Sequence, residues 1–192
     1  MKKRSWILLA LPIVFVACNN EAKDSVEKAD SANESKMDTS SNTTKTIAVD
    51  ESTSDFMVTV ADVGMTEVEL GQIAQQKSAN QQVKNFGAMM VEDHSKAGGE
   101  LKSLAARKNV TLPATIGEEH KKKIDNLSKK SGKDFDKAYM DMMVEGHEAT
   151  VKDFENASSN TKDADVKAWV DQTLPILKKH LDSAKAIRKA IK

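Results

Sequence analysis

Apolar residues recur at steps of three and four over most of the chain, the spacing typical of amphipathic α-helices. Four long stretches show this pattern, and short polar segments separate them. A shorter amphipathic piece, which contains Ile124 and Leu127, lies between the second and third stretches. The long stretches begin near Phe56, Val83, Phe135 and Val166. The pattern therefore predicts four long helices and one short helix.

The connections between these stretches predict how the helices pair. Asn80 marks a short break between the first and second stretches, and the segment around Asn160 marks another between the third and fourth. Short connections favour antiparallel neighbours, whereas the longer segment between the second and third stretches requires a crossover. We expect an all-α, antiparallel four-helix bundle with the short helix in its crossover. Pro175 lies inside the last stretch, where we expect a kink.

Composition supports a helical protein and excludes one class of partner. Aromatic residues make up 4% of the chain and charged residues 30%, with only 8 glycines and 3 prolines. These proportions favour helix over sheet. Because 29 basic residues balance 29 acidic ones, the chain lacks the positive charge that nucleic acids require of a partner.

The N-terminal segment has the features of an export signal. Lys2, Lys3 and Arg4 precede an apolar run from Trp6 to Val16, which is too short to span a bilayer but suits a signal peptide. The run ends at Ala17-Cys18, in the manner of a bacterial lipobox, and Cys18 is the only cysteine. We expect a signal peptide over 1–17 and lipidation of Cys18, the alternative being an ordinary secretory signal with an incidental cysteine.

The remaining boundaries follow from composition. The segment up to Ser52 is dominated by small polar and charged residues, so we expect a lipidated flexible tether over 18–52 and the bundle domain over 53–192. The protein would contact the membrane through its N-terminal lipid. Asn19 after Cys18 favours an outer-membrane, periplasm-facing location in the bacterial envelope by the usual sorting logic.

Four ionisable residues fall on the apolar faces of the four long stretches, where such groups are costly unless partnered. Three histidines and a carboxylate suit one transition metal ion such as zinc, iron, manganese or copper. Counting residues from the two breaks places three of them at the same height along the bundle axis. The same count leaves His180 about 10 Å away along that axis. The predicted metal ligands are Glu67, His94, His147 and His180.

Neighbouring residues refine this metal hypothesis. Asp93 is a candidate to orient a histidine ring without binding the metal itself. Met90 and Met143 each precede a histidine by four residues and therefore share its helix face, which is a weaker indication of copper. Val91, Val144 and Leu177 stand where a di-iron bundle would have glutamates, which argues against ferroxidase chemistry.

An alternative assigns the same residues a purely structural role, as a hydrogen-bonded network that fixes helix register. No Ser-His-Asp set, glycine-rich phosphate loop or cysteine-based zinc pattern occurs in the sequence. No catalytic residue is therefore predicted, and a non-enzymatic role is favoured.

Several segments resemble the family known as domain of unknown function 4142. They are Glu67-Val68-Glu69-Leu70-Gly71, Met90-Val91-Glu92-Asp93-His94-Ser95, Met143-Val144 with His147, and Leu174-Pro175 with His180-Leu181. The resemblance implies a ferritin-like four-helix bundle exported from bacteria, often described as a predicted outer membrane protein, without an established activity. The expected function is an envelope lipoprotein that binds a metal ion or small ligand through its core Glu/His cluster. The alternative is a structural or interaction lipoprotein whose buried histidines only fix packing.

Overall fold

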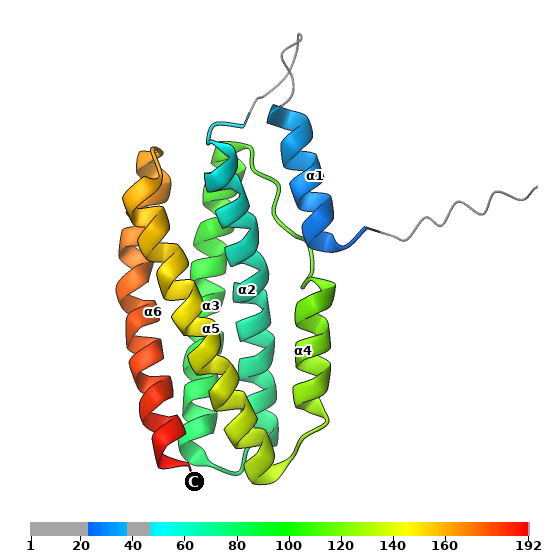
Figure 1. The fold of residues 1–192 in the computed structure, drawn as a ribbon, viewed down its shortest axis with the longest axis vertical. Coiled ribbons are helices and arrows are strands. Elements are labelled where there is room, and N and C mark those ends of the chain that lie inside the picture. The colour runs from blue at the N-terminus through cyan, green and yellow to red at the C-terminus, as the bar shows by residue number, and fades with distance from the viewer. Residues whose placement is uncertain (1–22, 38–46, 192) are drawn as a thin grey trace, which may run out of the picture.

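The computed structural model describes residues 23–37 and 47–191, and within these ranges the secondary structure is entirely helical (Figure 1). The expectation of an all-α bundle is confirmed. None of the helices in these ranges is both long and apolar enough to cross a membrane. The helices are α1 (Ser25–Met37), α2 (Glu51–Lys77), α3 (Gln81–Lys108), α4 (Glu118–Ser128), α5 (Gly132–Asn160) and α6 (Ala164–Ala190).

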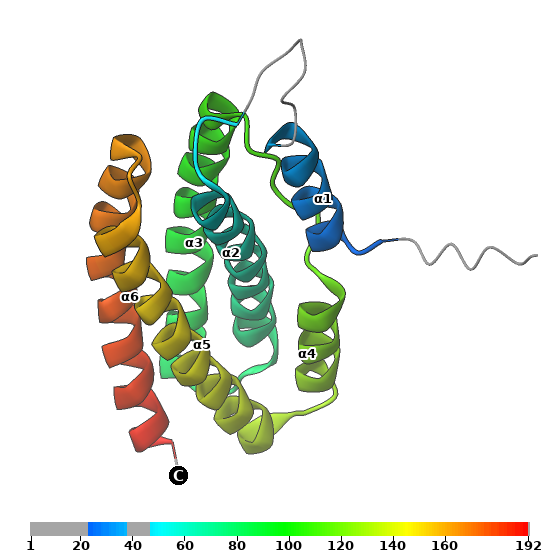
Figure 2. The same ribbon diagram turned by 45° about the horizontal axis from the view of Figure 1, so that its top comes forward.

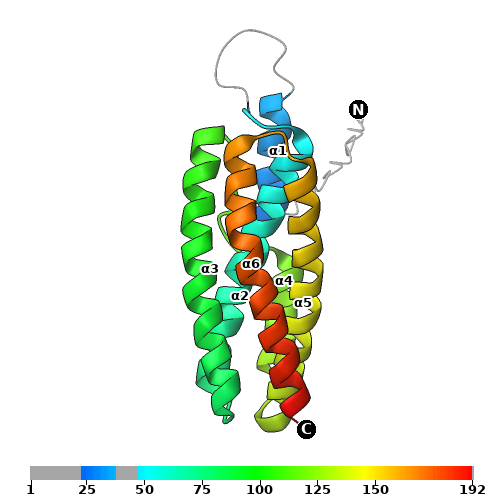
Figure 3. The same cartoon turned by 90° about the vertical axis from the view of Figure 1, so that its left-hand side faces the viewer.

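Two helical hairpins form the body of the molecule. The most extensive helix contacts join α2 to α3 and α5 to α6, and each pair runs antiparallel across a short connection (Figures 1 and 3). Further contacts of α2 with α5 and of α3 with α6 close the bundle. The crossover between the hairpins carries α4, which packs on α2 and α5.

Side-chain caps set where the long helices begin. Asn80 accepts hydrogen bonds from the backbone N–H groups of Gln82 and Val83, and Asp163 caps α6 in the same way through Asp165 and Val166. These caps satisfy donors that have no partner inside the helix. The sequence had indicated a break at Asn80 and another around Asn160, and the helices begin just after these breaks. α6 continues through Pro175 as one helix.

Glycines allow α2 and α3 to approach closely. A Cβ atom placed on Gly71 would lie 2.6 Å from the carbonyl oxygen of Gly87, and one placed on Gly87 would lie 2.7 Å from the carbonyl oxygen of Gly71. Both distances are shorter than a methyl group tolerates, so this crossing requires glycine on both helices. The contact lies one turn from Glu67 on α2 and two turns from His94 on α3.

The core consists of two apolar clusters. One contains Leu70, Met90, Phe135 and Tyr139, and the other contains Met57, Leu101, Phe154 and Trp169. Along every long helix, the change from one cluster to the other occurs at a buried ionisable residue. These four residues, which we call the polar layer, are Glu67 on α2, His94 on α3, His147 on α5 and His180 on α6.

The segment expected to be a flexible tether contains a helix. α1 packs on α2, and the amide of its buried Asn33 forms two hydrogen bonds with the backbone of Thr111, at 2.9 and 2.7 Å (Figure 2). Ser25 accepts hydrogen bonds from the N–H groups of Ala114 and Thr115. The prediction failed for 25–37 because long-range polar contacts to the crossover, rather than apolar periodicity, hold this helix. The predicted signal peptide and Cys18 lie outside the described residues.

Candidate metal centre

The polar layer brings all four predicted ligands together. Glu67 and His147 are 3% and 0% exposed, and His94 and His180 are 8% and 1% exposed. The ring centroids of the three histidines lie 5.3 to 5.7 Å apart. Four ionisable side chains, one from each long helix, therefore share one buried site.

His180 belongs to this group, although counting residues from Asn160 placed it about 10 Å away. The connection at 161–163 is not helical, so α6 begins only at Ala164. His180 is then about 16 residues from the start of α6, against about 13 from His147 to the end of α5, a mismatch of roughly 4.5 Å at 1.5 Å per residue. The late helix start removes more than half of the expected offset.

Glu67 holds two of the rings from one side. Its Oε2 lies 3.1 Å from Nδ1 of His94, and its Oε1 lies 3.3 Å from Nδ1 of His147. Nδ1 of His147 also donates a hydrogen bond of 2.9 Å to the carbonyl oxygen of Met143. Because a carbonyl can only accept, this contact requires the hydrogen on Nδ1 and leaves the lone pair of His147 on Nε2.

Asp93 holds the third ring. Its Oδ2 lies 2.8 Å from Nε2 of His180, so the hydrogen of a neutral His180 ring is on Nε2 and its lone pair is on Nδ1. The sequence had suggested Asp93 as an orienting residue, and the structure pairs it with His180 rather than with the adjacent His94. Carboxylates that orient imidazoles in this way are common around protein-bound metals.

The three remaining ring nitrogens are buried without a partner. Nε2 of His94, Nε2 of His147 and Nδ1 of His180 have no hydrogen-bond partner among residues 23–37 and 47–191. For His147 and His180, these are the atoms that carry the lone pair when Met143 and Asp93 fix the tautomer. The Oε2 atom of Glu67 lies 3.1 Å from Nδ1 of His94 but is itself buried without a hydrogen-bond partner. One ring nitrogen from each histidine can be chosen so that all three lie within 4.8 Å of one another.

This arrangement fits a transition metal ion. Imidazole nitrogens around one tetrahedral ion at about 2.0–2.1 Å lie roughly 3.3 Å apart, so small ring rotations would close the group. The donor set is three neutral imidazoles with a nearby carboxylate, which suits zinc, copper and iron. Glu67, predicted as a fourth ligand, contacts the Nδ1 atoms of His94 and His147, and its role as a ligand stays a prediction.

Burial also favours the neutral rings of His94 and His180. Desolvation lowers the pKa of His94, and the neighbouring His147 lowers it further, although Glu67 opposes the shift. Desolvation lowers the pKa of His180 to about 4, although the hydrogen bond that its ring donates to Asp93 opposes the shift. Neutral imidazole is the form that coordinates metals. Burial and Glu67 also raise the pKa of Tyr139, so its hydroxyl stays protonated.

These pKa shifts predict that the free energy of unfolding of the metal-free protein decreases at acidic pH. An unfolded histidine has a pKa near 6.5, so between about pH 6.5 and 4 the unfolded chain binds a proton that folded His180 does not. The lowered pKa of folded His94 acts in the same direction. Their contribution to stability is fully present above pH 6.5 and is lost as pH falls toward 4. Urea unfolding at a series of pH values should show this loss, and His180→Gln should reduce it. Constant stability between pH 7 and pH 4.5 in the wild type would contradict the prediction.

The structure also places the two candidate methionines and the fourth histidine of the chain. Met90 and Met143 are buried in the first apolar cluster, and Met143 contacts His147 through its backbone carbonyl. His120, the fourth histidine of the chain, is partly buried, with its Nδ1 2.6 Å from Oδ2 of Asp62. Asp62 also accepts a hydrogen bond of 2.7 Å from the N–H of Gly117 and so ties α2 to the crossover. Sequence reasoning missed Asp62, which has no partner nearby in the chain.

Comparison with known proteins identifies the family but no activity. A search of curated proteins finds no significant match. Among solved structures, the chain resembles "CopM in the Cu(II)-bound form", with 16% identity and a TM-score of 0.62 over 72% of this chain and 96% of that chain. At this identity the likeness shows a shared fold. The sequence model of the domain of unknown function DUF4142 matches residues 38–187. This match spans most of the sequence, and the chain therefore belongs to the DUF4142 family.

Proposed function

We propose that this protein binds one transition metal ion in its core, through Nε2 of His94, Nε2 of His147 and Nδ1 of His180. The observation that carries the proposal is that these three buried nitrogens lack a partner. The opposite nitrogens of His147 and His180 are hydrogen-bonded, and that of His94 lies 3.1 Å from a carboxylate oxygen of Glu67. Glu67, Asp93 and the Met143 carbonyl are then orienting groups. The carboxylate of Glu67 also offsets part of the positive charge of the ion.

Copper(II) is the metal we propose first. Among first-row divalent ions it has the highest affinity for nitrogen ligands, and imidazole is a suitable ligand for it. The structural neighbour that shares the fold is named for its Cu(II)-bound form, which supports the same choice. Zinc is the second choice because three imidazoles and one open position also satisfy its tetrahedral preference.

We propose a binding role rather than an enzymatic one. Across the described part of the chain, the polar layer contains no nucleophile paired with a base. A second candidate function is structural: the polar layer separates two apolar clusters, and a mismatch of helix levels would leave ionisable groups facing apolar ones. This candidate requires the same contacts but no metal.

Metal content separates these two functions. Protein produced without a histidine tag, loaded with Cu(II) and desalted should retain about one equivalent per chain by elemental analysis. His94→Ala and His147→Ala should each retain far less. Because metal ligands must be deprotonated, the bound copper should be released as pH falls toward about 4, the pKa of His180 in the folded protein. A wild-type protein that retains no copper or zinc at pH 7.5 would favour the structural function.

We further propose that the bundle is of the ferritin-like type and is carried on a lipid-anchored envelope protein, facing the periplasm from the outer membrane. Two antiparallel hairpins joined by a long crossover support the first part. The lipobox-like segment ending at Cys18 supports the second. Such an anchor would hold the domain at the membrane through acyl chains.

The anchor is tested by Cys18→Ser. The variant should be released from the membrane fraction or remain as unprocessed precursor, because the serine hydroxyl does not replace the acylated thiol. Detergent partitioning and intact-mass measurement check this result, with wild type as the control. Normal processing and normal partitioning of the variant would rule out the lipid anchor.

A further inference from the structure

The carboxylate of Asp93 connects the buried histidines to the surface of the protein. The side chain of Asp93 is 36% exposed, whereas His180, which donates a hydrogen bond to it, is 1% exposed. The two other groups that contact the histidine rings belong to Glu67 and Met143, which are 3% and 2% exposed. Of the three groups that orient the rings, only the carboxylate of Asp93 therefore reaches solvent.

This carboxylate lies at the seam between the two helical hairpins. Asp93 is on α3 and His180 is on α6, and Oδ2 of Asp93 lies 2.8 Å from Nε2 of His180. The two helices lie side by side (Figure 3), but their contact is less extensive than the contacts within either hairpin. The hydrogen bond from His180 to Asp93 therefore spans a part of the bundle where helix packing is limited.

Only one oxygen of the Asp93 carboxylate is used inside the protein. Oδ2 accepts the hydrogen bond from His180, whereas Oδ1 forms no hydrogen bond or ion pair with residues 23–37 or 47–191. A carboxylate attracts cations from solution, and its oxygens bind divalent metal ions. Asp93 therefore has one oxygen available to an arriving cation, while its other oxygen holds a candidate metal ligand.

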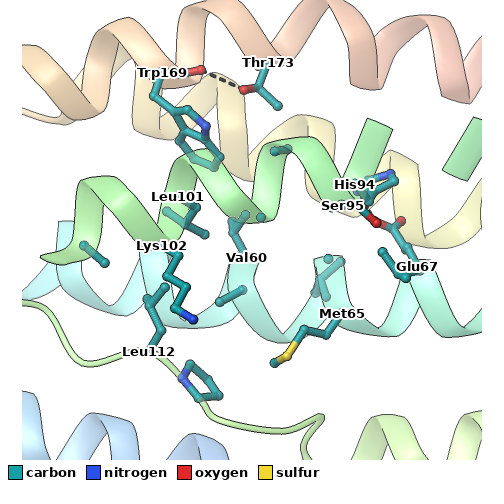
Figure 4. Close-up of a pocket in the computed structure, with 18 of the residues that line it drawn as sticks. Val60, Met65, Glu67, His94, Ser95, Leu101, Lys102, Leu112, Trp169 and Thr173 are labelled. Atoms are coloured by element: carbon teal, nitrogen blue, oxygen red, sulfur yellow. Dashed lines mark hydrogen bonds and ion pairs between the residues drawn. The ribbon is translucent and has the colours of Figure 1, made fainter. Parts of the chain in front are cut away.

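A cavity beside the site is a less suitable route for a cation. Its volume is about 850 Å³, and Figure 4 shows Glu67 and His94 at one end of it. Most of its lining side chains are apolar, so a divalent ion would lose hydration along the walls without gaining ligands. Nε2 of His94 and Oε2 of Glu67 are buried, and neither His147 nor His180 lines the cavity. The seam at Asp93 therefore provides the more polar approach to the histidines.

We propose that Cu(II) enters the buried site at Asp93, across the seam between α3 and α6, and that the Asp93 carboxylate is the first group of the protein to contact it. This inference rests on the proposed function, because it assigns the route by which the ion reaches the three histidines. Asp93 then has two roles: its Oδ2 orients the ring of His180, and its negative charge raises the rate at which the cation binds. His180 is the first histidine on this route.

The first test measures the rate of Cu(II) binding to the full chain, by stopped-flow quenching of its tryptophan fluorescence. Asp93→Asn keeps an oxygen that accepts from Nε2 of His180 but removes the negative charge. At about 20 mM salt the association rate constant should fall about three- to tenfold, because the attraction between the cation and the carboxylate is lost. At about 1 M salt, where the Debye length is about 3 Å, the variant and wild type should differ less than twofold.

Glu92→Gln is the matched control for the charge. Glu92 is the neighbouring residue on α3 and is exposed, and no hydrogen bond or ion pair joins it to the described part of the chain. The substitution removes the same charge from the same helix without touching the seam. Its association rate constant should stay within about twofold of wild type at low salt, since one distant exposed charge is largely screened.

The second test distinguishes the seam from the cavity. A Cβ atom added to Gly98, which lines the cavity, would meet no other atom within 4 Å, so Gly98→Leu narrows the cavity without a clash at Cβ. This variant should bind Cu(II) at the wild-type rate. Slower association in Gly98→Leu, together with an unchanged rate in Asp93→Asn, would overturn the proposal in favour of entry through the cavity.

The two rate constants separate entry from orientation. If Asp93 only orients His180, Asp93→Asn should change the dissociation rate constant and leave association unchanged at every salt concentration, and this result would overturn the entry route alone. If wild type binds no Cu(II) at equilibrium, the proposed function fails and the entry route fails with it. Normal equilibrium binding by wild type, with salt-dependent slowing of association in Asp93→Asn, supports both.

Discussion

Adding Cu(II) to one hundred times its dissociation constant should raise the free energy of unfolding by about 2.7 kcal/mol, because the metal binds the folded state alone. For a protein of this size, this corresponds to an increase in melting temperature of about 5–10 °C. His94→Ala, His147→Ala and His180→Ala should each abolish the increase, since each removes one of the three unpartnered nitrogens. Thermal unfolding followed by circular dichroism measures the effect.

His120→Ala is the matched control for these variants. It removes the fourth histidine of the chain, which pairs with Asp62 outside the polar layer, so it should lower stability while keeping the full response to copper. The double variant His94→Ala/His147→Ala should lose no more of the copper response than either single variant, because either change alone removes the site. If copper leaves wild-type melting unchanged while every alanine lowers stability, the polar layer has only a structural role. A full copper response in His180→Ala would place this residue outside the site.

The substitution Gly71→Ala should destabilise the protein by about 3 kcal/mol, near the upper end of the usual cost of overpacking. The new methyl group would lie 2.6 Å from the carbonyl oxygen of Gly87, and a backbone atom cannot rotate away. α2 and α3 must therefore separate. The melting temperature should fall by about 6–12 °C, as measured by thermal or urea unfolding.

The control is Gly64→Ala on the same helix. Its Cβ would meet no atom within 4 Å, so alanine's higher helix propensity should stabilise the protein by up to about 1 kcal/mol. Because Gly71 also faces Met90, one turn from His94, the Gly71→Ala variant should bind copper more weakly as well. Stability of Gly71→Ala within 0.5 kcal/mol of wild type, taken as the usual scatter of neutral changes, would show that the crossing can relax.

Prediction from sequence succeeded where the signal was local or periodic. The helical repeat placed Glu67, His94, His147 and His180 on the buried faces of four separate helices, and all four are buried there. The polar breaks at Asn80 and around Asn160 lie at the ends of long helices, as the pattern predicted. Such features depend on residues within a few positions of one another, so the sequence alone contains them.

The sequence by itself thus determined the all-α fold, the order of the four long helices and the short crossover helix, and the candidate residues of the polar layer. Only the tertiary structure decided that His180 joins the other histidines, because its level depends on three non-helical residues at 161–163. It also decided that Asp93 orients His180, that Asp62 pairs with His120, and that Asn33 anchors α1. Each of these contacts joins groups that are distant in the chain, and the geometry of a hydrogen bond at that range is fixed by packing rather than by local sequence pattern.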